Sequence, residues 1–187
     1  MNQICSSIRK KQINRFTKDI LILLLLFCVT YTIKAHFFQF AIIRGESMYP
    51  TFADQDVILV NQFNYTLSRG DVILIDMSNK SLPGRYIVKR IIAVEGDSIN
   101  LDYENNTVCV NGMKILEPYL NYGCDDPMMS LDTVKNITYQ VPMGMVFVLG
   151  DNRNNSIDSR YEMIGMISKA DIAGQVCYNF SHLFCMS

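Results

Sequence analysis

An uncharged apolar run, ILILLLLFCVTYTI at residues 20–33, follows a basic segment and limits what the chain can fold into. A helix over this run spans about 21 Å, whereas the hydrocarbon core of a membrane is about 30 Å thick. The difference closes if the side chains of Lys18 and Lys34 reach opposite interfaces. We therefore expect a transmembrane helix over residues 17–36. A helix buried in a protein core fits less well, because the run is apolar on every side.

The basic segment predicts how this helix would be oriented. Lysine and arginine residues beside a span stay in the cytoplasm, which makes residues 1–16 a cytoplasmic tail and places 37–187 outside the membrane. A cleavable secretory signal also begins with basic residues, but TIKAHFFQF after the run offers no small-x-small cleavage site. We therefore favour an uncleaved anchor.

The rest of the chain consists of short β-branched or aromatic runs separated by turn residues, which is typical of an all-β domain. The runs are residues 56–60, 71–75, 85–94, 98–101, 107–110, 136–141, 145–149 and 171–178. Asn111-Gly112 between two runs indicates a tight hairpin. Residues 117–135 are polar without a clear period, and predict a long surface excursion. The 17 basic and 18 acidic residues give no reason to expect a nucleic-acid partner.

Cysteine usage leaves the redox state of the outer domain open. Cys5 precedes the predicted anchor and Cys28 lies within it. The four remaining cysteines permit three disulfide pairings, and an unpaired set is equally consistent with the sequence. The most local pairings join Cys109 to Cys124 and Cys177 to Cys185. No CxxC spacing or Cys/His cluster predicts a metal site.

The run YIVKRIIAV carries two adjacent cations, Lys89 and Arg90, at its centre. Side chains alternate between the faces of a strand, so Ile87, Lys89, Ile91 and Ala93 would share one face, and Val88, Arg90, Ile92 and Val94 the other. A buried lysine can lose its proton, whereas a buried arginine needs a carboxylate or solvent. The alternative, which the strand alone favours, is a pair of gatekeeper charges that protects an edge strand from aggregation.

A candidate nucleophile, Ser47, lies on a constrained turn in RGESMYPTF. The motif is not the GxSxG elbow of the α/β-hydrolases, because no glycine follows at the required position. Two histidines are available as a base, but His36 lies at the membrane edge and His182 near the carboxyl terminus has no acidic residue nearby. The remaining base for a serine is a desolvated lysine, for which Lys89 is the candidate.

Five ordered motifs resemble those of the bacterial type I signal peptidases, also called leader peptidases. They are the amino-terminal anchor, GESMYPTF, RGDVIL, YIVKRIIAVEGD and GDNRNNSIDSR, and they cover nearly the whole chain. The resemblance implies that Ser47 is the nucleophile, that Lys89 is the general base, and that Ser156 orients the lysine amine through a hydrogen bond. It also implies an ion pair between Asp158 and Arg160 beside the site.

The resemblance gives the lysine a chemical task that its ordinary pKa does not allow. An exposed lysine has a pKa of about 10.4, so only about one amine in a few thousand is neutral at pH 7. Desolvation between Ile87 and Ile91 would lower this pKa by several units. Met48, by the resemblance, would help to keep water away from the base.

The resemblance further implies coiled antiparallel sheets with an inserted β-hairpin region at about residues 97–142, and no cofactor. Its reaction is the removal of signal peptides from exported precursors, after small residues at the first and third positions before the cut. Precursors and the lipid bilayer are the implied partners, with the secretion machinery as a further candidate. A hydrophobic lip would hold the site at the membrane where tethered substrates arrive. Its expected members are Phe37, Phe38, Phe40 and Phe52.

Three positions depart from the pattern of the resemblance. Gly45 stands where many relatives place a serine or threonine, so the oxyanion would rely on backbone N–H groups, chiefly that of Ser47. Asn154 stands where an acidic residue is common, and RYEMIG at 160–165 is about two residues longer than the usual spacing.

Other functions remain alternatives. A membrane-anchored β-domain of the same fold could bind a partner without catalysis, but retention of Ser47, Lys89 and Ser156 argues against this. A self-cleaving repressor-type protease needs a DNA-binding domain, for which the anchor leaves no room. Eukaryotic microsomal relatives use histidine where this chain has Lys89, so the bacterial type is the better match.

Overall fold

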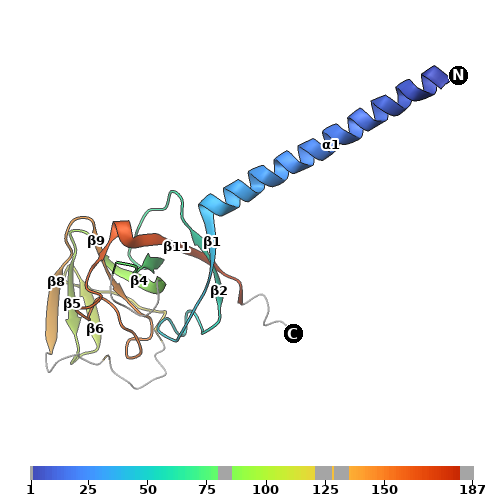
Figure 1. Cartoon of the computed structure of the whole chain (residues 1–187). Helices are drawn as coiled ribbons and strands as arrows, with labels where there is room; N and C mark the ends of the chain where they lie inside the picture. Colours follow the sequence, from blue (N-terminus) through green and yellow to red (C-terminus); the bar gives the residue numbers. More distant parts are fainter. Residues whose placement is uncertain (1, 80–85, 121–127, 129–134, 182–187) are drawn as a thin grey trace. The chain divides into compact units, whose positions relative to one another are not determined.

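A computed structural model describes residues 2–79, 86–120, 128 and 135–181 (Figure 1). The chain divides into two compact units, Met1–Gln39 and Phe40–Ser187. The first unit is dominated by one helix and the second is built from strands.

Helix α1 (Asn2–Phe37) contains the whole of the predicted anchor but begins well before it. The early start follows from residues 2–16, which contain no glycine or proline to interrupt a helix. The apolar side chains of residues 20–32 are largely exposed along the helix. In the described residues, no helix has both the length and the apolar character that crossing a membrane requires. The structure therefore does not confirm the predicted transmembrane helix over 17–36.

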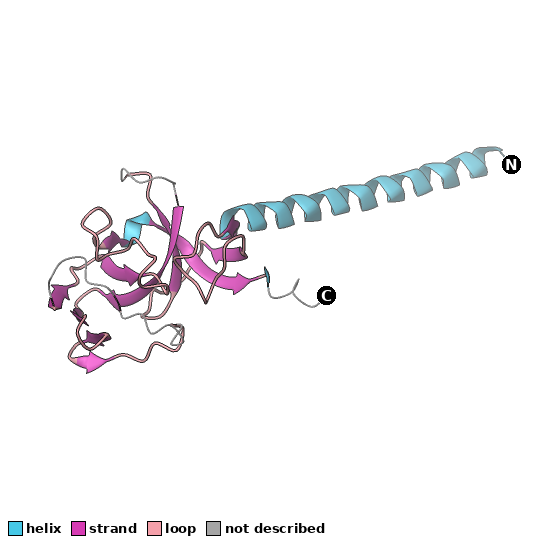
Figure 2. Ribbon diagram, turned by 90° about the horizontal axis from the view of Figure 1, so that it is seen from below, coloured by secondary structure: helices cyan, strands magenta, loops and turns pink. Residues whose placement is uncertain are grey.

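Antiparallel strands build the second unit, which confirms the predicted all-β domain. One sheet has the order β1 (Phe38–Ile42), β2 (Val57–Asn61), β11 (Ile172–Asn179), β3 (Val72–Asp76), β4 (Tyr86–Val94), β9 (Met145–Leu149) and β10 (Ile167–Ser168). The other has the order β7 (Met113–Lys114), β6 (Thr107–Val110), β5 (Ser98–Asp102) and β8 (Asn136–Gln140). Figure 2 shows strands and loops throughout this unit, with η1 (Lys169–Asp171) as a short helical turn before β11.

All eight predicted runs form strands, and β7 is the second strand of the predicted hairpin, whereas β1 and β10 were not anticipated. β10 is two residues long, which is too short to show an alternating pattern. β1 begins at Phe38, directly after the helix, in a stretch whose aromatic residues resemble a continuation of the apolar anchor.

The second sheet is formed by residues between 98 and 140 and lies in sequence between β4 and β9, which pair with each other. Figure 1 shows β5, β6 and β8 side by side at one end of the strand-built unit. The predicted hairpin is confirmed, since Val110 pairs with Met113 across Asn111 and Gly112. Both turn residues have positive φ, at 54° and 78°, as a two-residue turn of this kind requires.

An ion pair connects the RGDVIL motif to this hairpin. Arg69 precedes β3, and its Nε donates to Oδ2 of Asp97 at 2.8 Å. Asp97 precedes β5 and also accepts from the Asn111 side chain at 2.9 Å. The buried carboxylate of Asp97 thus joins the start of β3 to the β6–β7 turn.

A bulge in β4 changes the faces predicted for its second half. Ile91 pairs with Val148 and Ala93 with Phe147, which leaves one extra residue between them. Ile92 and Ala93 therefore pack in the same core cluster, while Ile91 packs with Val94 in another. The prediction that Ala93 shares the face of Ile91 was wrong, because the bulge breaks the simple alternation.

Both cations of β4 are buried inside the fold. β4 lies between β3 and β9, and Lys89 and Arg90 are 3% and 9% exposed. The gatekeeper interpretation was wrong, because both charged side chains are buried in the fold instead of being displayed to solvent at a sheet edge.

Three cysteines, Cys28, Cys109 and Cys177, are free thiols in the part of the chain that the structure describes. Cys124 and Cys185, the most local possible partners of Cys109 and Cys177, lie outside the described residues, as do His182 and most of the predicted excursion at 117–135.

Candidate active site

Ser47 lies on a turn between β1 and β2 that is fixed by backbone hydrogen bonds. The N–H of Gly45, which has φ +85°, donates to Oδ1 of Asp54 at 2.7 Å. The N–H of Phe52 donates to the carbonyl of Met48 at 3.0 Å. The buried Met48 side chain packs in the core cluster that also contains residues of β2 and β3. The turn therefore presents Ser47 from an anchored backbone.

Lys89 reaches this turn from the middle of β4. Its Nζ lies 2.7 Å from Oγ of Ser47 and forms a hydrogen bond with it. Burial lowers the pKa of the Lys89 amine from 10.5 to about 8. Arg160 lowers this pKa further, whereas the carboxylates of Asp158 and Asp151 act in the opposite direction. The structure thus brings a serine hydroxyl into contact with an amine that deprotonates far more readily than an exposed lysine.

Gly150 provides the surface on which the turn and the loop after β9 meet. A Cβ atom at this position would lie 2.2 Å from Oγ of Ser156 and 2.5 Å from the carbonyl oxygen of Ser47. No side chain fits at such distances, so glycine is required by close approach. The N–H of Asn152 donates to the same Ser47 carbonyl at 3.0 Å. The loop at 150–160 therefore holds the backbone of the candidate nucleophile.

Ser156 does not make the contact that was expected of it. Its buried Oγ has no hydrogen-bond partner among the described residues. The Lys89 amine bonds to Ser47 instead, and the Ser156 hydroxyl packs against the Cα of Gly150. The predicted bond between Ser156 and the lysine is absent from this part of the structure, although both residues border the same loop.

Asp158 and Arg160 form a fully buried ion pair in this loop. Nε of Arg160 donates to Oδ1 of Asp158 at 2.8 Å, and Nη2 donates to Oδ2 at 3.0 Å. Oδ2 of Asp158 also accepts from the N–H of Gly150 at 3.0 Å. Arg160 additionally donates to the Arg153 carbonyl. The pair consequently fixes the loop at both ends.

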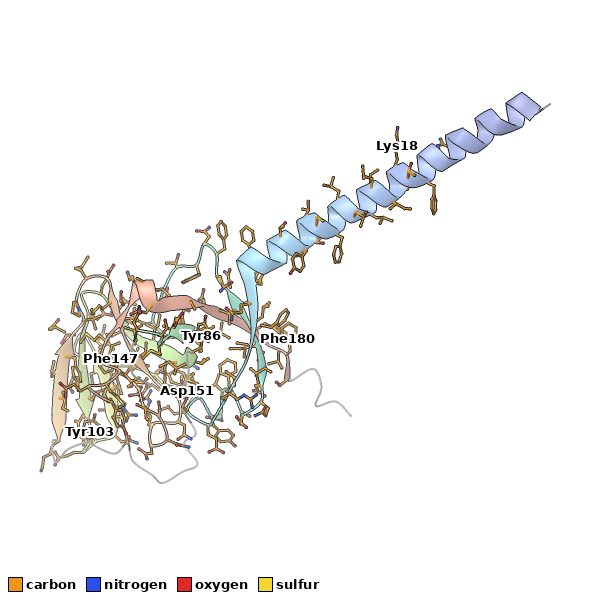
Figure 3. The ribbon with its side chains drawn as sticks, in the orientation of Figure 1. Lys18, Tyr86, Tyr103, Phe147, Asp151 and Phe180 are labelled. Atoms are coloured by element: carbon orange, nitrogen blue, oxygen red, sulfur yellow. The ribbon has the colours of Figure 1, made fainter. Side chains whose placement is uncertain are left out.

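Arg90 finds its carboxylate in Asp151, a residue that the sequence did not single out as its partner. Nε and Nη2 of Arg90 donate to the two oxygens of Asp151 at 2.8 and 2.6 Å. Figure 3 labels Asp151 within the strand-built unit. Nη1 donates to the Gly70 carbonyl at 2.7 Å, and Thr51 donates to Asp151 at 2.5 Å. Asp151 follows the β9 residue Leu149, which pairs with Arg90, so a correct β4–β9 pairing would have identified it.

The buried ion pair between Arg153 and Glu117 was also not predicted from the sequence. Nη2 and Nη1 of Arg153 lie 2.5 and 3.2 Å from the Glu117 carboxylate. Burial alone would lower the pKa of Arg153, but the Glu117 carboxylate keeps it above its usual value. Glu117 lies in a polar stretch without periodicity, and no sequence signal connects it to Arg153.

The longer loop at 160–165, the aromatic residues expected in the hydrophobic lip and the possible metal ligands complete the comparison with the sequence predictions. RYEMIG is ordered as a turn in which the N–H of Gly165 donates to the Tyr161 carbonyl at 2.8 Å. Phe52 is 7% exposed and belongs to a core cluster, so it is not part of an exposed lip, whereas Phe38 and Phe40 are 41% and 48% exposed. Within the described ranges, no group of His, Cys, Asp or Glu side chains could hold a metal ion.

The chain is similar to characterised bacterial peptidases over most of its length. It is 37% identical over 180 residues to signal peptidase I U of Bacillus subtilis, covering 93% of this chain and 91% of that protein. It is 38% identical over 151 residues to signal peptidase IB of Staphylococcus aureus, covering 74% and 75%. A crystal structure of a signal peptidase I from Enterococcus faecalis aligns with a TM-score of 0.48 at 28% identity, covering 60% of this chain and 98% of that one.

Residues 14–180 match the family model described as signal peptidase, peptidase S26, and this match contains the Ser47 turn, the Lys89 strand and the loop at 150–160. The chain therefore belongs to the peptidase S26 family of signal peptidases and is a serine endopeptidase of the signal peptidase I type.

Proposed function

We propose that this enzyme removes signal peptides from exported precursor proteins, with Ser47 as the nucleophile and Lys89 as the general base. The observation that carries the proposal is the 2.7 Å contact between Ser47 Oγ and Lys89 Nζ, with the amine buried. A neutral amine at this distance accepts the hydroxyl proton, which activates the serine.

The reaction then follows from the positions of the two groups. Ser47 Oγ bonds to the scissile carbonyl carbon while Lys89 takes its proton. The protonated amine next gives this proton to the leaving amine of the mature protein, which leaves an ester between Ser47 and the signal peptide. Lys89 finally takes a proton from a water molecule whose oxygen bonds to the ester carbon. The bond from this carbon to Ser47 Oγ then breaks, Lys89 returns the proton to Oγ, and the signal peptide leaves with a free carboxyl group.

The backbone N–H of Ser47 is the proposed donor to the oxyanion. No described residue accepts a hydrogen bond from it, so it is available to the substrate. Gly45 contributes no side-chain hydroxyl to this task. One main-chain donor in a water-excluded site can still accelerate the reaction by about a hundredfold.

The strand that carries Lys89 offers a place for an extended substrate. Residues 87–89 pair with β3 on one side, whereas the pairing of β4 with β9 begins only at Arg90. No described strand covers the other side of residues 87–89. A substrate segment added there as a strand would pass directly beside Lys89.

The apolar run at 20–33 is the proposed means of membrane attachment. Its exposed leucine and isoleucine side chains lie along helix α1, and lipid would cover them. With residues 1–16 on the cytoplasmic side, the strand-built unit would meet precursors on the outer face, together with the secretion machinery that delivers them.

The test is cleavage of a purified precursor whose signal ends in Ala-x-Ala by detergent-solubilised enzyme, with the cut mapped by mass spectrometry. The parent enzyme should cut after the second alanine, and Ser47→Ala should not cut while keeping its circular dichroism spectrum. Retained cleavage by Ser47→Ala at the same bond would refute the assignment. A parent enzyme that binds precursor without cutting would support the partner-binding alternative.

A further inference from the structure

A short segment that follows β7, residues 117–119, contacts the site from outside both sheets. The Glu117 carboxylate is 6% exposed and accepts from Arg153 through both Nη atoms. It also accepts from the Tyr119 hydroxyl at 2.9 Å. Two neighbouring side chains of one segment are thus joined to each other and to the loop after β9.

Glu117 is connected through Arg153 to the backbone that holds Ser47. Arg153, fixed by Glu117, donates from Nε to the carbonyl of Gly150 at 3.1 Å. Gly150 is the residue whose Cα packs against Ser47 and Ser156. The orientation of the Gly150 peptide therefore depends on where the Arg153 side chain is held.

Tyr119 is connected through Arg90 to the other side of the same turn. The guanidinium of Arg90 lies 4.0 Å from the centre of the Tyr119 ring. Arg90 in turn binds both oxygens of Asp151, which accepts from Thr51, four positions after Ser47. The ring covers the arginine that connects the Lys89 strand to the Ser47 turn.

We propose that Glu117 and Tyr119 are positioning residues for peptide-bond hydrolysis at this site. Glu117 sets the Gly150 peptide through Arg153, and Tyr119 fixes the Arg90–Asp151 pair, so that Ser47 and Lys89 stay in hydrogen-bond contact. This inference rests on the proposed function of the Ser47–Lys89 pair. A misplacement of about 1 Å between reacting groups lowers a rate by about a hundredfold, even when the altered residue is remote.

Two variants separate positioning from simple charge balance. Glu117→Gln removes the ion-pair partner of the buried Arg153 guanidinium, which affects folding as well as geometry. The double variant Glu117→Leu with Arg153→Met removes both charges and keeps apolar volume. If Glu117 only neutralises Arg153, the double variant regains parental kcat. If Glu117 positions Gly150, the double variant regains its melting temperature but keeps a kcat about a hundredfold below that of the parent.

Two variants of Tyr119 test its role in the same way. Tyr119→Phe removes the hydroxyl that donates to Glu117 but keeps the ring against Arg90, whereas Tyr119→Leu removes both. We expect Tyr119→Leu to lower kcat further than Tyr119→Phe, with KM changed less than kcat in each. Equal losses in the two variants would contradict a role for the ring.

Each variant is measured in full-length enzyme with the precursor assay, at a temperature where circular dichroism shows it folded. Glu104→Gln is the matched control, because it removes an exposed carboxylate paired with Lys135 in the second sheet region and should keep parental kcat. Cleavage by the parent and its loss in Ser47→Ala test the proposed function separately. With those results in place, parental kcat in the double variant, or in Glu117→Gln, overturns the positioning role.

Discussion

Replacement of Lys89 by arginine or methionine tests whether burial makes this amine the base. Burial lowers its pKa from 10.5 to about 8. About one amine in ten is then neutral at pH 7, against about one in three thousand at the ordinary pKa, so burial raises the population of reactive base about 300-fold. We therefore expect kcat/KM to rise about tenfold per pH unit below pH 8 and to level off above it.

Lys89→Arg and Lys89→Met should both be inactive across this range. The arginine preserves charge and reach, but its pKa above about 12 denies it a neutral form in a protein. The assay is cleavage of one precursor by the parent and both variants from pH 6 to 10.5. Normal cleavage by Lys89→Arg, or a parental rate that still climbs tenfold per unit beyond pH 10, would refute the reasoning.

The same pKa shift makes a prediction for stability. Below pH 8 Lys89 is protonated in both states, and the folded state bears the full cost of the buried charge, about 3 kcal/mol. Between pH 8 and 10.5 the unfolded state binds more protons, so stability rises with pH until the cost is gone. Lys89→Met should thus raise the free energy of unfolding at pH 7 by up to about 3 kcal/mol. Urea titrations at pH 7 and 10.5 measure this, and equal stability of parent and variant at pH 7 would contradict it.

Four further substitutions test the surroundings of the pair. Gly150→Ala should lower kcat about a hundredfold, because its Cβ would lie 2.2 Å from the Ser156 hydroxyl beside the site. Gly174→Ala is the control: its Cβ would lie 2.5 Å from atoms of β2, so this variant should lose stability but keep its kcat. Arg90→Lys should lower the free energy of unfolding by about 2 kcal/mol, because lysine cannot reproduce the paired bonds to Asp151, and parental urea stability would oppose this. Gly45→Ser should cost about 1 kcal/mol because of φ +85°, without a gain in activity; a faster enzyme would show that its hydroxyl reaches the oxyanion.

The strands could be predicted from sequence because their β-branched runs are bounded by turn residues, and Asn111-Gly112 marks a two-residue turn. The contact between Ser47 and Lys89 was expected because the two histidines were unsuitable as bases and because of the family resemblance, since neither spacing nor periodicity joins two such distant positions. The bulge after Ile91 left no pattern in the apolar run. Glu117 was not found because its partner lies in another part of the chain, and pairing between buried charges is decided by tertiary packing.

The place of β11 has a consequence for how the enzyme is made. Strand β11 lies between β2 and β3 and pairs with both, so these two earlier strands have no bridge until residues 172–179 are available. A growing chain on the ribosome would hold the Ser47 turn and the Lys89 strand in separate, incomplete pieces, with open strand edges. Pairings over such sequence distances form slowly and late. Proteolytic activity would thus begin only after residues 172–179 have been synthesised and have paired with both strands.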